Sequence, residues 1–451
     1  MSASKKGSMT IFLALTVLTF FSFCLVLIEG TRIYFLRLQA MQAMELAEFS
    51  VLSEYQQEVF EKYHLFFLDL DYEQGKESVG ILEQRAKNYL TKNATQLQTK
   101  NLIAGKFCRA TDGGGSVFFE QVTAWMKLKN GYGTFEEIFA GLNDVKLEEI
   151  DLELILKEQK NKAGGIITKE NISDSKDLGN IVLPDISFPS IRSLTESVLG
   201  NVEDLSKKSI DLSERIAKRA IMEGAGQKTR FSITDMQLFH TYIFENCSCY
   251  GAKQLDSWNE SLSYQVEYIV SGKSNDRKNL ENVMWKIFLL RAGGNYLFYH
   301  QDTKVQAKAQ AEAVALVGVL GNAALIELVK EIILISQAIE DGVSQTKQIF
   351  TGDKIPLYQN GIFSGLKVGY QEYLYLFLNS MNATEKIYRT MDVLELEIRK
   401  QSGYEKFCWD HCVDRLELQW SYQFPSLFTG SNFFRGGIYE NTIVRKLYYE
   451  K

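Results

Sequence analysis

Proline and histidine are scarce in this chain, with four of each among 451 residues. So few prolines favour long helices, because proline removes a backbone donor and kinks a helix. The histidines are scattered, and none stands in an H-E-x-x-H motif or a comparable metal-binding spacing. No serine stands in a G-x-S-x-G nucleophile elbow, and no basic block indicates nucleic-acid binding. We therefore expect no enzymatic site, no metal or other cofactor, and no nucleic-acid partner.

Cysteine is also sparse, and the six residues are too scattered to form a disulfide framework. Their sharpest grouping is Cys247 and Cys249 together with Cys408 and Cys412, a pair that would share one face of a helix. Two such pairs could bind zinc or form disulfides, but C-x-C is shorter than the usual zinc-knuckle spacing. Buried, unlinked thiols are the interpretation that we favour.

The first long feature of the chain is an apolar run from Met9 to Ile28 without charge, proline or glycine. As a helix it would be about 30 Å long, enough to cross the hydrocarbon core of a bilayer. A cleaved secretory peptide has a shorter apolar region and a small-residue cleavage site, which the residues around Glu29 do not supply. A helix of this length that packs on the core of a soluble protein would show a polar face, and this run has none. The run therefore favours an uncleaved membrane span.

Lys5 and Lys6 precede this span, and Arg32 and Arg37 follow it with Glu29. Basic residues before a first span favour a cytoplasmic N-terminus. We therefore expect a single-pass protein of the cell membrane whose body lies outside the cell.

Beyond the membrane, 45% hydrophobic and 24% charged residues are typical of a globular body. The patterns predict a mainly helical α+β protein that ends in a β-hairpin. We expect these consecutive parts: a short basic leader (1–8), a transmembrane helix (9–28), a stalk helix that continues from it (29–63), an α+β region (64–157), a loop or linker (158–190), and a mainly helical region with the C-terminal β-hairpin (191–451).

The residue patterns also give five local predictions. Residues 64–72 indicate a buried strand, and the three glycines within 111–116 indicate a turn rather than a phosphate cradle. Single helices are predicted over 191–222 and 369–400. The apolar stretch 311–339 predicts a buried helical hairpin, with a second membrane span as the alternative.

Several stretches resemble a known family. The N-terminal ones are KKGSMTIFLALTVLTFF and IEGTRIYFLRLQAMQAMELAEFSVLSEYQQEVFEKYHLFFLD, and the later ones are DGGGSVFFEQVTAWMK, EYIVSGKSNDRKNLENV, YRTMDVLELEIR and FCWDHCVD. The chain resembles uncharacterised membrane proteins of Gram-positive bacteria whose N-termini are similar to TadE-type pseudopilins of Flp (Tad) pilus systems. The resemblance implies prepilin-type processing between Gly7 and Ser8. The chain differs from pilins at Phe12, where they usually carry glutamate.

These observations together predict a non-enzymatic, membrane-anchored component of a Tad/Flp pilus-like assembly or secretion apparatus, in a pseudopilin-like or scaffold role. Its partners would be the lipid bilayer and, through the N-terminal helix, other membrane or pilus-assembly proteins. The alternative is an anchored extracellular binding or sensor module unrelated to pili. A third reading is an anchored hydrolase whose site matches no known motif.

Overall fold

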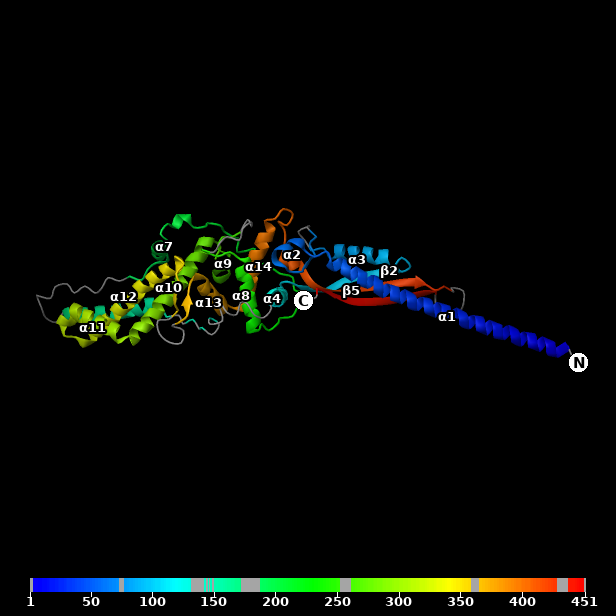
Figure 1. Ribbon diagram of the computed structural model, residues 1–451, viewed down its shortest axis with the longest axis horizontal. Coiled ribbons are helices and arrows are strands. Elements are labelled where there is room, and N and C mark those ends of the chain that lie inside the picture. Colours follow the sequence, from blue (N-terminus) through cyan, green and yellow to red (C-terminus); the bar gives the residue numbers. More distant parts are fainter. Residues whose placement is uncertain are drawn as a thin grey trace. The chain divides into compact units, whose positions relative to one another are not determined.

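The structure is a computed structural model of the whole chain (Figure 1). It shows a mainly helical α+β protein with a long apolar helix at the N-terminus and paired strands at the C-terminus, which confirms the predicted fold class. The residues described below are 3–72, 77–130, 142, 145, 147, 150–171, 187–251, 261–357, 365–427 and 437–449; the side chains of 3–8, 130 and 167–171 are outside the description.

The chain folds into two compact units that do not follow the sequence order. Unit 1 consists of residues 1–125, 221–230 and 401–451, and unit 2 of residues 126–220 and 231–400. The sequence predicted consecutive parts, with the C-terminal hairpin attached to the helical region. The structure instead places the hairpin in unit 1, because its first strand pairs with strands from the N-terminal part.

Unit 1 begins with α1 (Ala3–Leu52), a helix of 50 residues. The sequence predicted that this helix would run unbroken through residue 63. The structure ends it earlier and begins α2 (Gln57–Tyr63) after a short linker. Gln56 explains the break, because its side-chain oxygen caps α2 by accepting the N–H of Val59 at 2.8 Å. Its own N–H donates to the carbonyl of Phe67, which turns the chain back.

An antiparallel sheet forms the centre of unit 1. Strand β5 (Cys412–Pro425) pairs with β2 (Gln98–Arg109) along one edge. Along its other edge it pairs with β6 (Ile438–Tyr448) and with the short β1 (Leu68–Asp69). The unbroken β5–β6 register confirms the predicted C-terminal hairpin. The strand predicted over 64–72 is reduced to the two residues of β1.

One face of this sheet is covered by α1 and α3 (Val79–Asn93), which run beside β2 and β5 in Figure 1. The buried residues of α1 recur every three or four positions, so they form one face of the helix. Several are alanine, which lets the helix approach the strands closely. The core of unit 1 includes Leu36, Ala40, Met44, Ala47 and Val51 of α1, Leu82, Ala86 and Leu90 of α3, and Leu416, Leu418, Trp420, Tyr422 and Phe424 of β5.

Helix α4 (Asp112–Asn130) follows β2 and carries the chain from unit 1 into unit 2. In the described part of unit 2 the regular structure is helical apart from the short pair β3 (Ile355–Pro356) and β4 (Lys367–Val368) and one isolated bridge between Ser209 and Asn275. Its helices are α6 (Leu152–Asn171), α7 (Ile191–Leu199), η2 (Val202–Asp204), α8 (Ile233–Asn246), α9 (Gln265–Ser271), α10 (Asp276–Gln301), α11 (Thr303–Val317), η3 (Gly318–Leu320), α12 (Ala323–Phe350), α13 (Tyr370–Ser380) and α14 (Ala383–Arg399).

Helix α12 is the centre of the largest core in unit 2. It packs against α6, α7, α10 and α11, and its buried residues include Leu325, Val329, Ile332 and Ile335. A Cβ added at Gly342 would lie 2.9 Å from the Cβ of Ala292, so α10 and α12 are in close contact there. Helices α11 and α12 confirm the predicted hairpin over 311–339.

Three predicted boundaries in unit 2 were wrong. The helix expected over 191–222 stops at Leu199, because Gly200 follows with a φ of 74°. The helix expected over 369–400 is divided at Asn382, whose side chain caps α14 by accepting the N–H of Thr384. The linker expected over 158–190 is helical as far as Asn171, and residues 172–186 of it lie outside the described part of the chain.

Candidate functional site

The first part of α1 presents a large apolar surface. From Met9 to Ile28 nearly every large side chain is exposed, including the two end residues that the sequence identified as limits of the anchor. Helix α1 is long and apolar enough to cross a membrane, and no other helix among the described residues is. Gly7 and Ser8, the predicted processing site, lie in the same helix just before this surface, and their side chains are outside the described part.

The folded part of unit 1 begins at the residue that follows this surface. Glu29 is fully buried, and both of its carboxylate oxygens lie 3.2 Å from the backbone N–H of Leu427, which donates to them. Arg32 lies one turn later, with its guanidinium 3.4 Å from Glu29, and donates to the carbonyl of Pro425 at 2.9 Å. We call these four residues the collar. The collar ties α1 to the end of β5, so no free linker separates the membrane-length stretch from the sheet.

A second exposed apolar surface continues along α1 beyond the collar. Its six side chains are between 37% and 71% exposed. At about 100° per residue they fall on the side of the helix opposite to its buried face. We call this surface the apolar row; it consists of Tyr34, Phe35, Leu38, Met41, Leu46 and Phe49.

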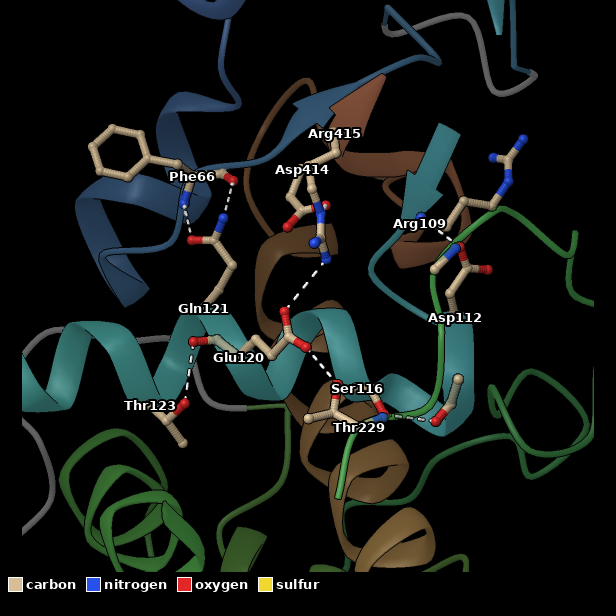
Figure 2. A network of polar contacts seen from close by, with 12 residues as sticks. Phe66, Arg109, Asp112, Ser116, Glu120, Gln121, Thr123, Thr229, Asp414 and Arg415 are labelled. Carbon is tan, nitrogen blue, oxygen red and sulfur yellow. Dashed lines mark hydrogen bonds and ion pairs between the residues drawn. The ribbon is translucent and has the colours of Figure 1, made fainter. Parts of the chain in front are cut away.

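A polar network surrounds the start of α4 (Figure 2). Its centre is the buried carboxylate of Asp112, which accepts backbone N–H groups from Arg109 at 2.8 Å, Gly224 at 2.8 Å and Gly226 at 2.9 Å. A Cβ on Gly224 would lie 2.3 Å from the Asp112 carboxylate, and one on Gly226 would lie 2.6 Å from its Cβ. Residues 221–230, which we call the strap, are therefore held closely against α4.

The three glycines of the predicted turn lie beneath the strap. Gly113, Gly114 and Gly115 have φ values of 60°, 77° and 81°, the left-handed region that glycine enters most readily. A Cβ on Gly113 would lie 2.8 Å from backbone atoms of Gln227 and Lys228. A phosphate cradle needs amides that are open to a ligand. Here the strap covers the turn, which supports its interpretation as a structural turn.

Glu120 joins the strap to the sheet in the same view (Figure 2). One of its oxygens accepts the hydroxyl of Thr229 at 2.5 Å, and the other lies 3.3 Å from the guanidinium of Arg415. Arg415 also pairs with its neighbour Asp414 at 3.0 Å. Ser116 adds a hydrogen bond from the N–H of Thr229 at 3.2 Å. Asp112 accepts backbone N–H groups of the strap, and Glu120 links the strap to Arg415, so the network holds the strap in place.

Unit 2 buries ionisable groups of its own. Nζ of Lys386 on α14 lies 2.6 Å from Nε2 of His240 on α8, and both side chains are at most 1% exposed. Burial lowers the pKa of Lys386 to about 7 and that of His240 well below its usual range. Glu267 on α9 has its pKa raised to about 7 by burial. An amine with a pKa near 7 has the chemistry of a base, but no substrate reaches this one in the observed conformation.

The cysteines that the sequence grouped fall in different units. Cys247 and Cys249 lie in unit 2, whereas Cys408 and Cys412 lie in unit 1, and no disulfide joins any of the six cysteines, all of which lie in the described part of the chain. Burial raises the pKa of Cys247, so its thiol stays protonated at neutral pH. Among the described residues, no group of three or more His, Cys, Asp and Glu is placed to hold a metal ion.

Sequence reasoning missed the three charged residues that matter most in this structure. Glu29 could have been noticed, because it is the first charge after a long apolar run. Asp112 carried a weak signal as the acid that opens a glycine-rich turn. Lys386 carried none, because a lysine that follows a glutamate in an amphipathic helix is expected to be exposed.

The chain matches a protein family described as "Family of unknown function (DUF5702)" over residues 184–362 and 364–424. The match takes in more than half of the chain, including most of unit 2 and strand β5, and leaves out α1 and β6. No curated protein matches the chain, and no solved structure does.

Proposed function

Since this chain belongs to the family of unknown function DUF5702, its role has to be argued from its own structure, and we propose that it is a single-pass, membrane-anchored component of an envelope assembly. In this role α1 holds the protein in the bilayer and also joins it to other membrane proteins. The proposal assigns no catalysis. The observation that carries it is the apolar row.

The collar supports a position for the membrane surface relative to the row. If residues 9–28 span the hydrocarbon core, the core ends close to Glu29, because this side chain is buried in protein contacts rather than in lipid. Phe49 then lies about 30 Å further along the helix, at about 1.5 Å per residue. Lipid tails do not reach that far, so the outer part of the row faces either water or another protein.

A protein partner explains the row better than water does. Large exposed apolar side chains that are aligned on one face mark interaction sites. The row is also continuous with the membrane-length stretch, so a single partner helix could follow α1 from the bilayer to the end of the row. An isolated sensor or binding module, the alternative considered from the sequence, has no need of such a face.

The N-terminal resemblance gives this assembly its type. The segment KKGSMTIFLAL at residues 5–15 is similar to the N-termini of TadE-type pseudopilins of Tad/Flp systems. We therefore propose a pseudopilin-like or scaffold role in a Tad/Flp pilus-like or secretion apparatus. Lys5 and Lys6 before the span support an orientation with the N-terminus in the cytoplasm and the two folded units outside the cell.

The contacts of the collar are also an argument against the removal of α1 as a secretory signal. A cut just after the apolar run, near Gly30, would separate Glu29 from Arg32 and would remove the acceptor of the Leu427 N–H. A cut between Gly7 and Ser8 would leave both the span and the collar intact. Processing of the prepilin type is therefore compatible with this fold.

A photocrosslinking experiment tests the role of the apolar row. A photoreactive phenylalanine analogue replaces Phe49 in the full chain, which is expressed in its native membrane. The control carries the same analogue at Leu128, which is 74% exposed but lies on α4. We expect Phe49 to give discrete crosslinks to membrane proteins or to a second copy, and Leu128 to give none. Equal crosslinking from both positions would remove the basis of the proposal.

Mass spectrometry of the mature N-terminus tests the type of assembly. A chain that starts at Ser8 supports processing of the pilin type. A chain that starts at Met1 or Ser2 supports a simple anchor, and a start beyond Arg32 contradicts the anchored protein altogether. Protease treatment of whole cells tests the orientation, because protection of both units would place them inside the cell.

A further inference from the structure

A pocket of about 340 Å³ lies in unit 1, on the face of the sheet opposite to α1 and α3. Two cross-strand rows form its floor. Cys108, Arg415 and Tyr448 pair in one row, and Gly105, Glu417 and Lys446 pair in the next. The pocket is lined by Lys106, Cys108, Ala225, Arg415, Leu416, Glu417, Lys446, Leu447 and Tyr448, so the strap contributes Ala225 to its wall.

Among the side chains that line this pocket, the cations Lys106, Arg415 and Lys446 outnumber the one anion, Glu417. Lys106 pairs with Glu417 at 3.0 Å, and the lysine side chain is 70% exposed whereas the glutamate is 16% exposed. Lys446 is exposed and has no ion-pair partner among the described residues. Burial raises the pKa of the Cys108 thiol, which is therefore neutral at pH 7 and adds no negative charge.

Two carboxylates hold the guanidinium of Arg415 in position. Its Nε donates to Asp414 at 3.0 Å and its Nη2 lies 3.3 Å from Glu120, the contact drawn in Figure 2. Among the described residues its Nη1 has no partner, although the side chain lines the pocket. A guanidinium whose other donors are fixed loses little freedom when a ligand arrives, which favours binding.

The backbone beside the pocket is locally strained. Lys106 has a φ of 51° at a bulge where the β2–β5 register shifts between Gly105 and Cys108. A lysine in the left-handed region costs on the order of 1 kcal/mol, and such residues and bulges are frequent at binding sites because they redirect side chains. Here the bulge is where the side chain of Lys106 reaches the rim of the pocket.

We propose that this pocket binds a small oxyanion, a molecule with a carboxylate or phosphate group, through Arg415 and Lys446. A planar guanidinium matches either group with two parallel hydrogen bonds, and an ammonium adds an unpaired positive charge. At about 30 Å³ for each water, the volume holds about ten waters, the size of a small metabolite. The site involves no residue of α1, so it stands independently of the assembly role.

Titration calorimetry on the full chain in a non-ionic detergent tests the site. Citrate and inorganic phosphate are the two probes, and they separate a carboxylate ligand from a phosphate ligand. The test variant is Lys446→Gln, because this lysine has no partner within the described chain whose loss could disturb the fold. The control is Lys100→Gln, which removes a charge from the same sheet face outside the pocket.

We expect saturable binding of at least one probe at one site per chain. Lys446→Gln should weaken it about tenfold, and Lys100→Gln by less than twofold. A second variant, Arg415→Gln, should abolish binding while circular dichroism reports an intact fold. The proposal is overturned if neither probe binds saturably at concentrations up to about 10 mM. Weaker binding than this corresponds to a binding free energy below about 3 kcal/mol in magnitude. Equal weakening by the two lysine variants would also overturn it, because it would indicate only diffuse charge.

Discussion

Replacement of Lys386 by methionine should make the protein more stable at neutral pH. The lysine is almost fully buried, and its Nζ has Nε2 of His240 as a partner at 2.6 Å. Burial is the cause of its lowered pKa. The ring of Tyr375 on α13 packs edge-on against His240 on the other side. Methionine fills a similar volume and does not have to leave water as a charged group.

The magnitude follows from the pKa. A folded-state value of about 7, against 10.5 for a free lysine, corresponds to about 5 kcal/mol at about 1.4 kcal/mol per pH unit. Because the pKa of the lysine is lower in the folded state, wild type has this stability of about 5 kcal/mol above pH 10.5 and loses it as the pH falls to about 7. The variant avoids that loss but leaves Nε2 of His240 without its partner, which costs about 1–3 kcal/mol. We expect Lys386→Met to gain about 2–4 kcal/mol at pH 7.

Urea unfolding at pH 7, 8 and 9 measures the effect. Hydrogen exchange in peptides from α14 monitors the unfolding, so the measurement reports on unit 2. The gain should shrink by about 2 kcal/mol between pH 7 and pH 9, because wild type recovers stability as the pH rises toward the pKa of the lysine in the unfolded chain. Thiols and other groups that titrate in this range are common to both proteins and cancel. Lys347→Met, at an exposed position of α12, is the control and should show no change with pH. A gain for Lys386→Met that stays constant from pH 7 to 9 would show that the buried lysine is charged in the folded protein.

Three further predictions concern buried acids and the strap. Glu267→Gln should raise the unfolding free energy by about 2 kcal/mol at pH 7 and by little at pH 5. The pKa of this acid is raised to about 7, so the wild-type fold loses stability as the pH rises from 4.5 to about 7. A denaturant series at both pH values measures the difference. Gly113→Ala should speed hydrogen exchange throughout the strap, whereas Gly200→Ala, which has a similar φ and open space around it, should not; identical exchange in both would show that the strap is held elsewhere. Glu29→Ala should cost about 1–3 kcal/mol by leaving the amide of the collar unpaired, and exchange of that amide should quicken, whereas the exposed Glu45→Ala should change neither.

The sequence contained most of the secondary structure because apolar spacing reports local burial. The apolar stretch of α1 from Met9 to Ile28 follows from the length of its uncharged run, and the hairpin over 311–339 and the strand pair at the C-terminus follow from apolar spacing. Helix breaks were harder to predict. Those at Gln56 and Asn382 are set by single side chains that cap the next helix, and an apolar pattern continues across them.

Long-range pairing could not be read from the sequence. Nothing in strand β5 indicates that it pairs with β1 and β2 rather than with a nearer segment, because strand periodicity fixes the buried face and not the partner. The same holds for the strap, whose two glycines pack on Asp112 far away in the chain. The apolar row was visible as residues, but its exposure became apparent only when the opposite face of α1 was seen to fill the core.

The central position of β5 constrains how this protein is made. The strand lies about 300 residues after β2, which at about 5–20 residues per second is a delay of roughly 15–60 seconds in synthesis. Throughout that time α1, α3 and β2 have no central strand to pack against, and their core side chains stay uncovered. Such non-local pairing is slow, and the waiting segments are open to aggregation. Unit 2 has no such delay, because all of its residues, 126–220 and 231–400, precede β5 in the chain. Unit 2 can therefore fold while unit 1 still waits for its last strands.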